Sequence, residues 1–236
     1  MDGWLVYGSV NDQIVNRLDP LKLPYVILGD HRCVHPISSA NVDHVAVGRM
    51  AVEHLASLGH RRIAFLGGSM RFVYQEQTRR GFCNARKEMG TDDDERLLTD
   101  HTVWSKSDPI MGMIYESNRE HVLEWVRSIA PTALLSSEPN WGPEMYRVLR
   151  QAQIEVPVDM SLLACEPDSV GAKSQNFTRL ELPMAEVGRQ GARLLRKMTL
   201  NPRMEPATVM IPPSLIQGWS TCPPRDTGVR QPKTTA

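Results

Sequence analysis

Between residues 46 and 66 the spacing of the hydrophobic positions changes from helical to strand-like. Over residues 46–58 apolar side chains recur at steps of three and four, which predicts an amphipathic helix. Gly59 follows directly, and glycine readily takes the left-handed conformation that commonly ends a helix. The continuous apolar run from Ile63 to Leu66 then predicts a strand covered on both faces, as in a parallel sheet. This part of the chain therefore predicts a helix, a turn and a buried strand.

The same alternation of strands and helices continues along the chain. Further strands are predicted over residues 4–7, 24–28, 102–104, 133–135, 160–164, 178–182 and 208–211. Further helices are predicted over residues 75–89, 118–129, 143–152 and 185–198. The alternation predicts an α/β fold in which helices cover both faces of a parallel sheet. Residues 222–236 lack apolar periodicity, and we expect them to form a disordered tail.

Length and composition limit the classes of protein that fit this pattern. With 236 residues, 41% of them hydrophobic and 23% charged, the chain can bury a core as one large domain or two small lobes. The 27 basic residues balance 27 acidic ones, so no overall charge favours nucleic acid or an anionic membrane. Neither a run of eighteen apolar residues nor a secretion leader at Met1 is found. We therefore expect a cytoplasmic protein with no membrane partner.

The sequence offers no pattern for metal binding or catalysis. Four cysteines, Cys33, Cys83, Cys165 and Cys222, are scattered without a CxxC pair, which favours reduced thiols over disulfides or a zinc site. The seven histidines show no metal-ligand spacing. No GxSxG, HExxH, Walker or GxGxxG signature occurs. We therefore expect no metal, no cofactor and no enzymatic activity.

Three stretches resemble the LacI/GalR family of bacterial transcription regulators. The segment VDHVAVGRMAVEHLASLGHRRIAFLGG, from Val42 to Gly68, is similar to the family pattern VD…GR.AAEHL..LGHRRIAFIGG. Arg80-Gly81-Phe82, followed by an amphipathic helix, is similar to its R..GF segment. Residues 131–168 follow its pattern PTAIFAAND…AL.ALRE.G..VP.DVSVVGFDD. The resemblance extends from Asp2 to about Pro224, and the order of several motifs makes it specific.

The resemblance implies a two-lobed fold of the periplasmic-binding-protein type, with a small molecule bound between lobes that three crossing strands join. Residues 1–41 plus 179–201 would form the first lobe, and residues 42–178 plus 202–221 the second. Asp2 to Val6 matches the third strand of the family's first lobe. The helix-turn-helix headpiece, the hinge helix and the first two strand-helix units are therefore missing from this sequence. We expect the incomplete first lobe to expose a sheet edge and an uncovered apolar face.

Four charged residues are candidates for effector binding because of their place in the family pattern. Glu166 matches an acidic position of the GFDD segment, and Glu138 matches the asparagine of AND. Both could instead be solvated residues at loop ends. Asp30 follows a strand one residue after the usual aspartate, where capping a helix or stabilising a turn is an equal alternative. Arg79 is the candidate to replace the family's ligand-contacting arginine, whose own position is occupied by Thr78.

Three aromatic residues stand where family members place side chains around the ligand. Phe72 and Tyr74 lie on the loop after Gly67-Gly68, and Trp104 begins the next loop. Aromatic rings stack on the flat apolar faces of sugars and bases while polar neighbours bind the hydroxyl groups. An aromatic residue beside a strand is also common in a core, so both roles stay open for these three.

The resemblance favours the effector-sensing domain of a LacI-like regulator, usually a repressor, that binds a sugar or related metabolite. A homodimer is the family habit, and operator DNA would be bound only through a headpiece that this sequence lacks. One alternative is the solute-binding protein of a sugar transport system, which uses the same fold without DNA. The other is a truncated regulator without function.

Overall fold

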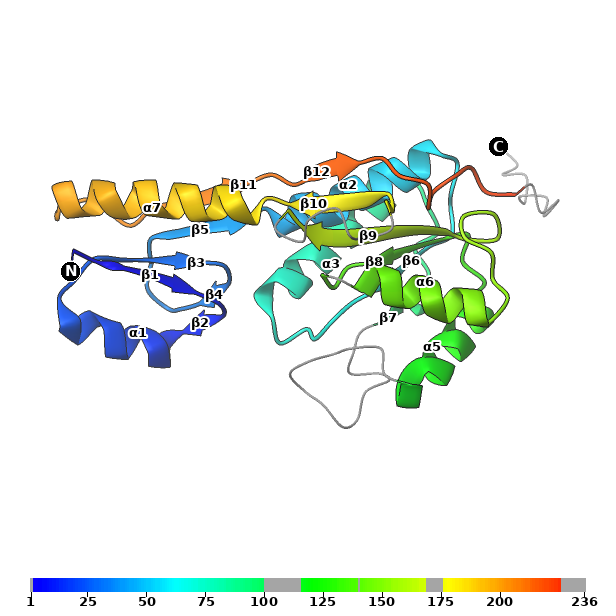
Figure 1. Cartoon of the computed structure of the whole chain (residues 1–236), viewed down its shortest axis with the longest axis horizontal. Coiled ribbons are helices and arrows are strands. Elements are labelled where there is room, and N and C mark those ends of the chain that lie inside the picture. The colour runs from blue at the N-terminus through cyan, green and yellow to red at the C-terminus, as the bar shows by residue number, and fades with distance from the viewer. Residues whose placement is uncertain (1, 100–115, 140, 169–175, 226–236) are drawn as a thin grey trace, which may run out of the picture.

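The computed structural model describes residues 2–99, 116–139, 141–168 and 176–225, which form two α/β lobes (Figure 1). The smaller lobe contains a parallel four-stranded sheet in the order β1-β3-β5-β11. Its strands are β1 (Trp4–Tyr7), β3 (Tyr25–Leu28), β5 (Ser39–Val42) and β11 (Thr208–Ile211). Helices α1 (Asp12–Leu18) and α7 (Met184–Leu200) lie on opposite sides of this sheet in Figure 1. A short 3-10 turn, Asp19–Leu21, and the paired strands β2 (Val10–Asn11) and β4 (His31–Arg32) complete the lobe.

The larger lobe contains a six-stranded sheet in the order β12-β10-β9-β8-β6-β7. All neighbouring pairs are parallel except β10 and β12. The strands are β6 (Ile63–Leu66), β7 (Leu98–Thr99), β8 (Ala133–Ser136), β9 (Ser161–Pro167), β10 (Arg179–Leu182) and β12 (Ser214–Ile216). The helices are α2 (His44–Ser57), α3 (Val73–Glu88), α5 (Glu116–Ile129) and α6 (Trp141–Gln151), with a 3-10 turn at Glu95–Leu97.

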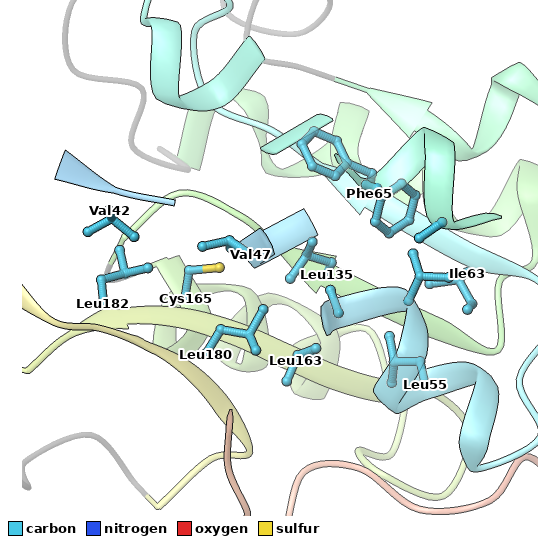
Figure 2. Packing of buried hydrophobic residues seen from close by; sticks show 14 of the residues in the cluster. Val42, Val47, Leu55, Ile63, Phe65, Leu135, Leu163, Cys165, Leu180 and Leu182 are labelled. Carbon is cyan, nitrogen blue, oxygen red and sulfur yellow. The ribbon is translucent and has the colours of Figure 1, made fainter. Parts of the chain in front are cut away.

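Alternating side chains of the larger sheet enter two hydrophobic clusters, one on each face. On β6, Ile63 and Phe65 pack with α2 and α3, while Ala64 and Leu66 pack with α5 and α6. This arrangement confirms the prediction, made from a continuous apolar run, of a strand covered on both faces. The first cluster also continues into the smaller lobe. Figure 2 shows Val42, at the end of β5, beside Leu182 at the end of β10.

The chain changes lobes at three points, and two of them differ from the expected boundaries. The first crossing, from β5 to α2, is near residue 42 as expected. However, β10 pairs with β9 of the larger sheet, and β11 pairs with β5 of the smaller sheet. The assignment of residues 179–182 to the first lobe and of residues 208–211 to the second was therefore wrong. The crossings lie after these strands, at Pro183 and at Pro212-Pro213.

The C-terminal segment returns to the base of the larger sheet and is held there by a buried histidine. His60 is 1% exposed, and its Nε2 lies 2.8 Å from the carbonyl oxygen of Cys222. Its Nδ1 lies 3.0 Å from Oγ1 of Thr132, and Ser161 Oγ accepts the backbone N–H of Cys222 at 3.0 Å. Residues 222–225 were expected to begin a disordered tail, but these contacts of Cys222 and an ion pair between Arg225 and Asp159 tie them to the lobe. Residues 226–236 lie outside the described residues.

Most predicted elements are present, and the differences are at short or polar segments. The predicted helices over residues 46–58, 75–89, 118–129, 143–152 and 185–198 correspond to α2, α3, α5, α6 and α7. Helix α1 and strands β2, β4, β5, β7 and β12 were not predicted. The strand expected over residues 102–104 lies outside the described residues. In the described part of the chain, no helix is long and apolar enough to cross a membrane.

The expected uncovered edge of the smaller sheet is present at β1. This strand pairs only with β3 among the described strands, and its other edge carries no partner there. Leu5 and Tyr7 are 42% and 75% exposed, which is high for apolar strand residues. An open edge with apolar side chains is a surface on which further strands can add.

Helices α2 and α3 approach so closely that glycine is required at their crossing. A side chain at Gly48 would overlap the carbonyl oxygen of Thr78, and one at Gly81 would overlap that of Val45. The atoms that an added side chain would meet belong to the backbone of the opposite helix. Neither helix can therefore make room without moving the other. The packing of α3 on the larger lobe therefore depends on these two residues.

We expect Gly81→Ala to lower the free energy of unfolding by about 3 kcal/mol, because the added methyl group must push the two helix backbones apart. Chemical denaturation with urea, followed by circular dichroism, measures this change. Gly188→Ala is the matched control, since no atom lies within 4 Å of the added carbon on helix α7. That variant should gain about 0.5–1 kcal/mol from helix propensity. Equal stability of the two variants would contradict the close-packing argument.

Candidate functional site

A cleft of about 540 Å³ lies between the two lobes, at the carboxyl ends of their parallel strands. The smaller lobe contributes Tyr7, Ser9, Asp30 and Asn41, among others, and the larger lobe contributes His44, Phe72, Tyr74, Pro139 and Pro167. Chain segments that follow parallel strands form the usual binding site of open α/β sheets. None of the described residues that line the cleft is a lysine or an arginine. The cleft therefore combines aromatic and apolar walls with a few hydrogen-bonding groups and one carboxylate.

Asp30 connects the two lobes across this cleft. It follows β3 and Gly29, whose φ of +113° turns the chain in a conformation that favours glycine. Oδ2 of Asp30 accepts the backbone N–H of Tyr74, on helix α3, at 2.6 Å, and Oδ1 accepts Nδ2 of Asn41 at 3.3 Å. Burial raises the pKa of Asp30, and the two hydrogen bonds oppose that rise. Asp30 thus makes a helix-capping contact, as in the alternative given for it, and because it also lines the cleft its effector contact stays a prediction.

Glu138 directly precedes the lining residue Pro139 and lies inside a hydrogen-bonded network. The Tyr74 hydroxyl donates to its Oε1 at 2.8 Å, and Nε2 of Gln75 donates to its Oε2 at 2.6 Å. Gln75 in turn accepts the Ser137 hydroxyl at 2.8 Å and is completely buried. Burial raises the pKa of Glu138, while both donors lower it. A side chain at Gly68 would overlap the Glu138 carboxylate, so the network also depends on that glycine.

Three rings form one wall of the cleft. Phe72 and Tyr74 are stacked with their centroids 5.6 Å apart, and His44 lies 5.4 Å from Tyr74 at a tilt of 46°. Burial lowers the pKa of His44 to about 4, so its ring is neutral at pH 7. This wall offers a flat apolar surface for a ring-shaped ligand, and effector binding by Phe72 and Tyr74 stays a prediction.

The other predicted effector contacts either do not line the cleft or lie outside the described residues. Glu166 is the second-last residue of β9, directly before the lining residue Pro167, is 2% exposed, and has an oxygen 3.7 Å from Nε of Arg179. Trp104 lies outside the described residues. Arg79 is not among the residues that line the cleft, and its guanidinium group lies 3.9 Å from the Glu95 carboxylate. The expected effector contact of Arg79 is therefore not supported, because one residue beyond Thr78 the helix has turned its side chain to another side.

Four residues of the site were missed by sequence reasoning. Tyr7 ends β1 and lines the cleft, but the rule that selected Asp30, the residue after a strand and a glycine, would have selected Ser9 there instead. Asn41 and His44 flank the first crossing between the lobes, but polar residues at that point carry no distinct sequence signal. Gln75 is polar and completely buried, and only the structure shows that Glu138 and Ser137 use its amide group.

The two lobes and the cleft between them define a binding protein with a ligand site at its centre. Among the described residues, no group of three or more His, Cys, Asp or Glu side chains is placed to hold a metal ion. The chain belongs to the periplasmic binding protein-like domain family, whose sequence profile matches residues 52–221. This membership supports the family resemblance drawn from the sequence motifs.

Individual relatives are transcription regulators. The HTH-type transcriptional regulator DegA of Bacillus subtilis is 25% identical over 203 residues, which cover 86% of this chain and 57% of the relative. The chain thus spans little more than half the length of this relative. A solved complex of the regulator CelR with cellobiose has a TM-score of 0.74 at 24% identity, over 93% of this chain and 66% of that one. A LacI family regulator from Enterococcus faecium with bound ribose has a TM-score of 0.72 at 21% identity, over 90% of this chain and 75% of that one.

Because His44 is buried and neutral, acid should destabilise the protein in a defined range of pH. The unfolded chain binds a proton at His44 below its ordinary pKa of 6.5, whereas the folded chain binds it only near pH 4. Stability should therefore fall as the pH drops from about 6.5 to 4. His44→Gln should reduce that loss by on the order of 2 kcal/mol. Urea unfolding at several pH values in that range measures it.

His121→Gln is the control for this pH series, because His121 is exposed on helix α5. Burial also lowers the pKa of His54 and His60, and their share of the acid loss remains in both variants. A pH profile of His44→Gln that matches the unsubstituted protein would show that His44 accepts a proton in the folded state.

Proposed function

We propose that this chain is the effector-sensing domain of a LacI-like transcription regulator, usually a repressor, that binds a sugar or related small metabolite between its lobes. The observation that carries this proposal is the cleft itself, where stacked aromatic rings from one lobe face hydrogen-bonding groups from the other. The regulator relatives favour this function over the solute-binding protein of a transport system. A cytoplasmic location follows from the same proposal.

Ligand binding in such a domain acts through the angle between the lobes. A ligand that contacts both lobes stabilises the closed arrangement in proportion to its higher affinity for that state. The three crossings allow this movement because they are the points where the backbone passes between the sheets. In the whole regulator, two copies would transmit the changed angle to DNA-binding headpieces. The 236-residue chain alone is then expected to bind effector without binding operator DNA.

The chemistry of the cleft favours a neutral ligand with a ring. Sugars present hydroxyl groups on their edges and apolar C–H faces above and below the ring, which suits stacked aromatic side chains. Asp30 is buried, and the carboxylates of Glu138 and Glu166 lie close behind the lining residues Pro139 and Pro167. A phosphorylated sugar would meet these carboxylates with no described arginine or lysine in the lining to compensate. Cellobiose and ribose, bound in two similar structures, are therefore reasonable first probes.

The direct test is calorimetric titration of the 236-residue protein with neutral mono- and disaccharides, beginning with cellobiose and ribose. We expect at least one neutral sugar to bind and to raise the melting temperature, because a ligand that binds only the folded state stabilises it. Phosphorylated forms of the same sugars provide the comparison. The proposal would be contradicted if the protein melts cooperatively but no sugar changes its melting temperature at millimolar concentration.

Phe72→Ala should weaken the binding of that sugar about tenfold, because it removes the exposed face of the aromatic stack at a cost of about 1.4 kcal/mol. Titration of the variant with the same sugar measures the change. Arg79→Ala is the matched control on the same helix, because its side chain faces Glu95 rather than the cleft. If Arg79→Ala loses as much affinity as Phe72→Ala, the cleft described above is not the binding site.

A further inference from the structure

Helix α3 begins without a cap of its own. Its N-cap residue is Phe72, whose side chain has no oxygen to accept a backbone N–H. The first N–H groups of a helix have no partner within the helix, and an N-cap side chain normally supplies one. Here Asp30 supplies it from the other lobe, because its Oδ2 lies 2.6 Å from the backbone nitrogen of Tyr74 in the first turn. The carboxylate also lies at the positive end of the helix dipole.

Each partner of this contact is fixed within its own lobe. The carbonyl oxygen of Asp30 accepts the backbone N–H of Val10, and its carboxylate accepts Nδ2 of Asn41, so the smaller lobe holds the residue in place. Helix α3 is fixed to the larger lobe by its close crossing with α2 and by Phe82, which is completely buried. A change in the angle between the lobes would therefore have to break the contact between Asp30 and Tyr74.

A second contact across the cleft is much weaker. Arg32 of the smaller lobe donates to Glu76 of helix α3 at 2.7 Å, but the two side chains are 65% and 62% exposed. An ion pair this exposed contributes little to stability. Asp30, in contrast, is 5% exposed and uses both carboxylate oxygens. At the same opening, the smaller lobe therefore makes one buried contact and one exposed contact with helix α3.

We propose that Asp30 is a latch between the lobes, which caps helix α3 from the smaller lobe and holds the angle between the lobes in the absence of ligand. A ligand that changes this angle would then have to break the contact, so the latch sets how much protein has a different angle before binding. The proposal concerns the ligand-free protein, and it stands or falls independently of which effector the cleft binds.

Small-angle X-ray scattering of the ligand-free, 236-residue protein tests the latch. We expect Asp30→Ala to increase the radius of gyration, because the lobes lose the buried contact that joins them at this opening. Asp30→Asn keeps an oxygen that can accept the Tyr74 N–H but loses the charge, so its radius of gyration should lie between those of Asp30→Ala and the unsubstituted protein. Arg32→Ala, which removes the exposed link at the same opening, should scatter like the unsubstituted protein.

Hydrogen exchange of single amides separates opening from unfolding. In Asp30→Ala the amide of Tyr74 should exchange about five- to tenfold faster, the effect expected from losing one helix cap, while the amide of Phe82 keeps its protection. Unchanged scattering together with unchanged exchange at Tyr74 would overturn the latch. Loss of protection throughout the smaller lobe in both Asp30→Ala and Asp30→Asn would also overturn it, because Asp30 would then maintain the fold of its own lobe.

Discussion

The arrangement of this protein depends on three backbone crossings between two sheets. At each crossing the last residues of a strand belong to one lobe and the next element to the other, so neither sheet is formed from one continuous segment. The hydrophobic cluster that joins Val42 to Leu182 follows the same path, so the lobes share part of their core (Figure 2). The cleft lies at the carboxyl ends of both sheets because the crossings place those ends face to face. Asp30 and Tyr74 can meet only in this arrangement.

The buried carboxylates around the cleft show how charge is held in an otherwise apolar site. Asp30 accepts a helix N–H and an amide group, Glu138 accepts a phenol and an amide group, and Glu166 lies beside Arg179. A buried charge without such partners would be costly, so each partner is needed for the fold as well as for the site. A ligand hydroxyl that bonds Glu138 must therefore share its oxygens with Tyr74 and Gln75. The predicted effector contact of Glu138 would therefore rearrange an existing network.

Sequence reasoning was most accurate where the apolar pattern alone decides the element. Strands β6, β8 and β11 were placed closely because a short apolar run in an α/β alternation has few other interpretations. Strand β5 was missed because Ser39 and Asn41 interrupt its pattern, and helix α1 was missed because seven residues carry little periodicity. In the site, position along the family pattern selected Phe72 and Tyr74, which line the cleft, and Arg79, which does not. A shift of one residue on a helix changes the direction of a side chain, and no pattern in a single sequence reports that direction.

The late position of β11 and β12 in the chain also constrains how the protein is made. The smaller sheet lacks its fourth strand until residues 208–211 exist, and the larger sheet lacks β12 until residues 214–216 exist. The carbonyl of Cys222 reaches His60 only later still. A ribosome releases the N-terminal part of a chain first, so neither lobe of this protein can finish folding before residues 208–222 have been made. Both lobes therefore complete their sheets almost together, although their first strands are made far apart in time.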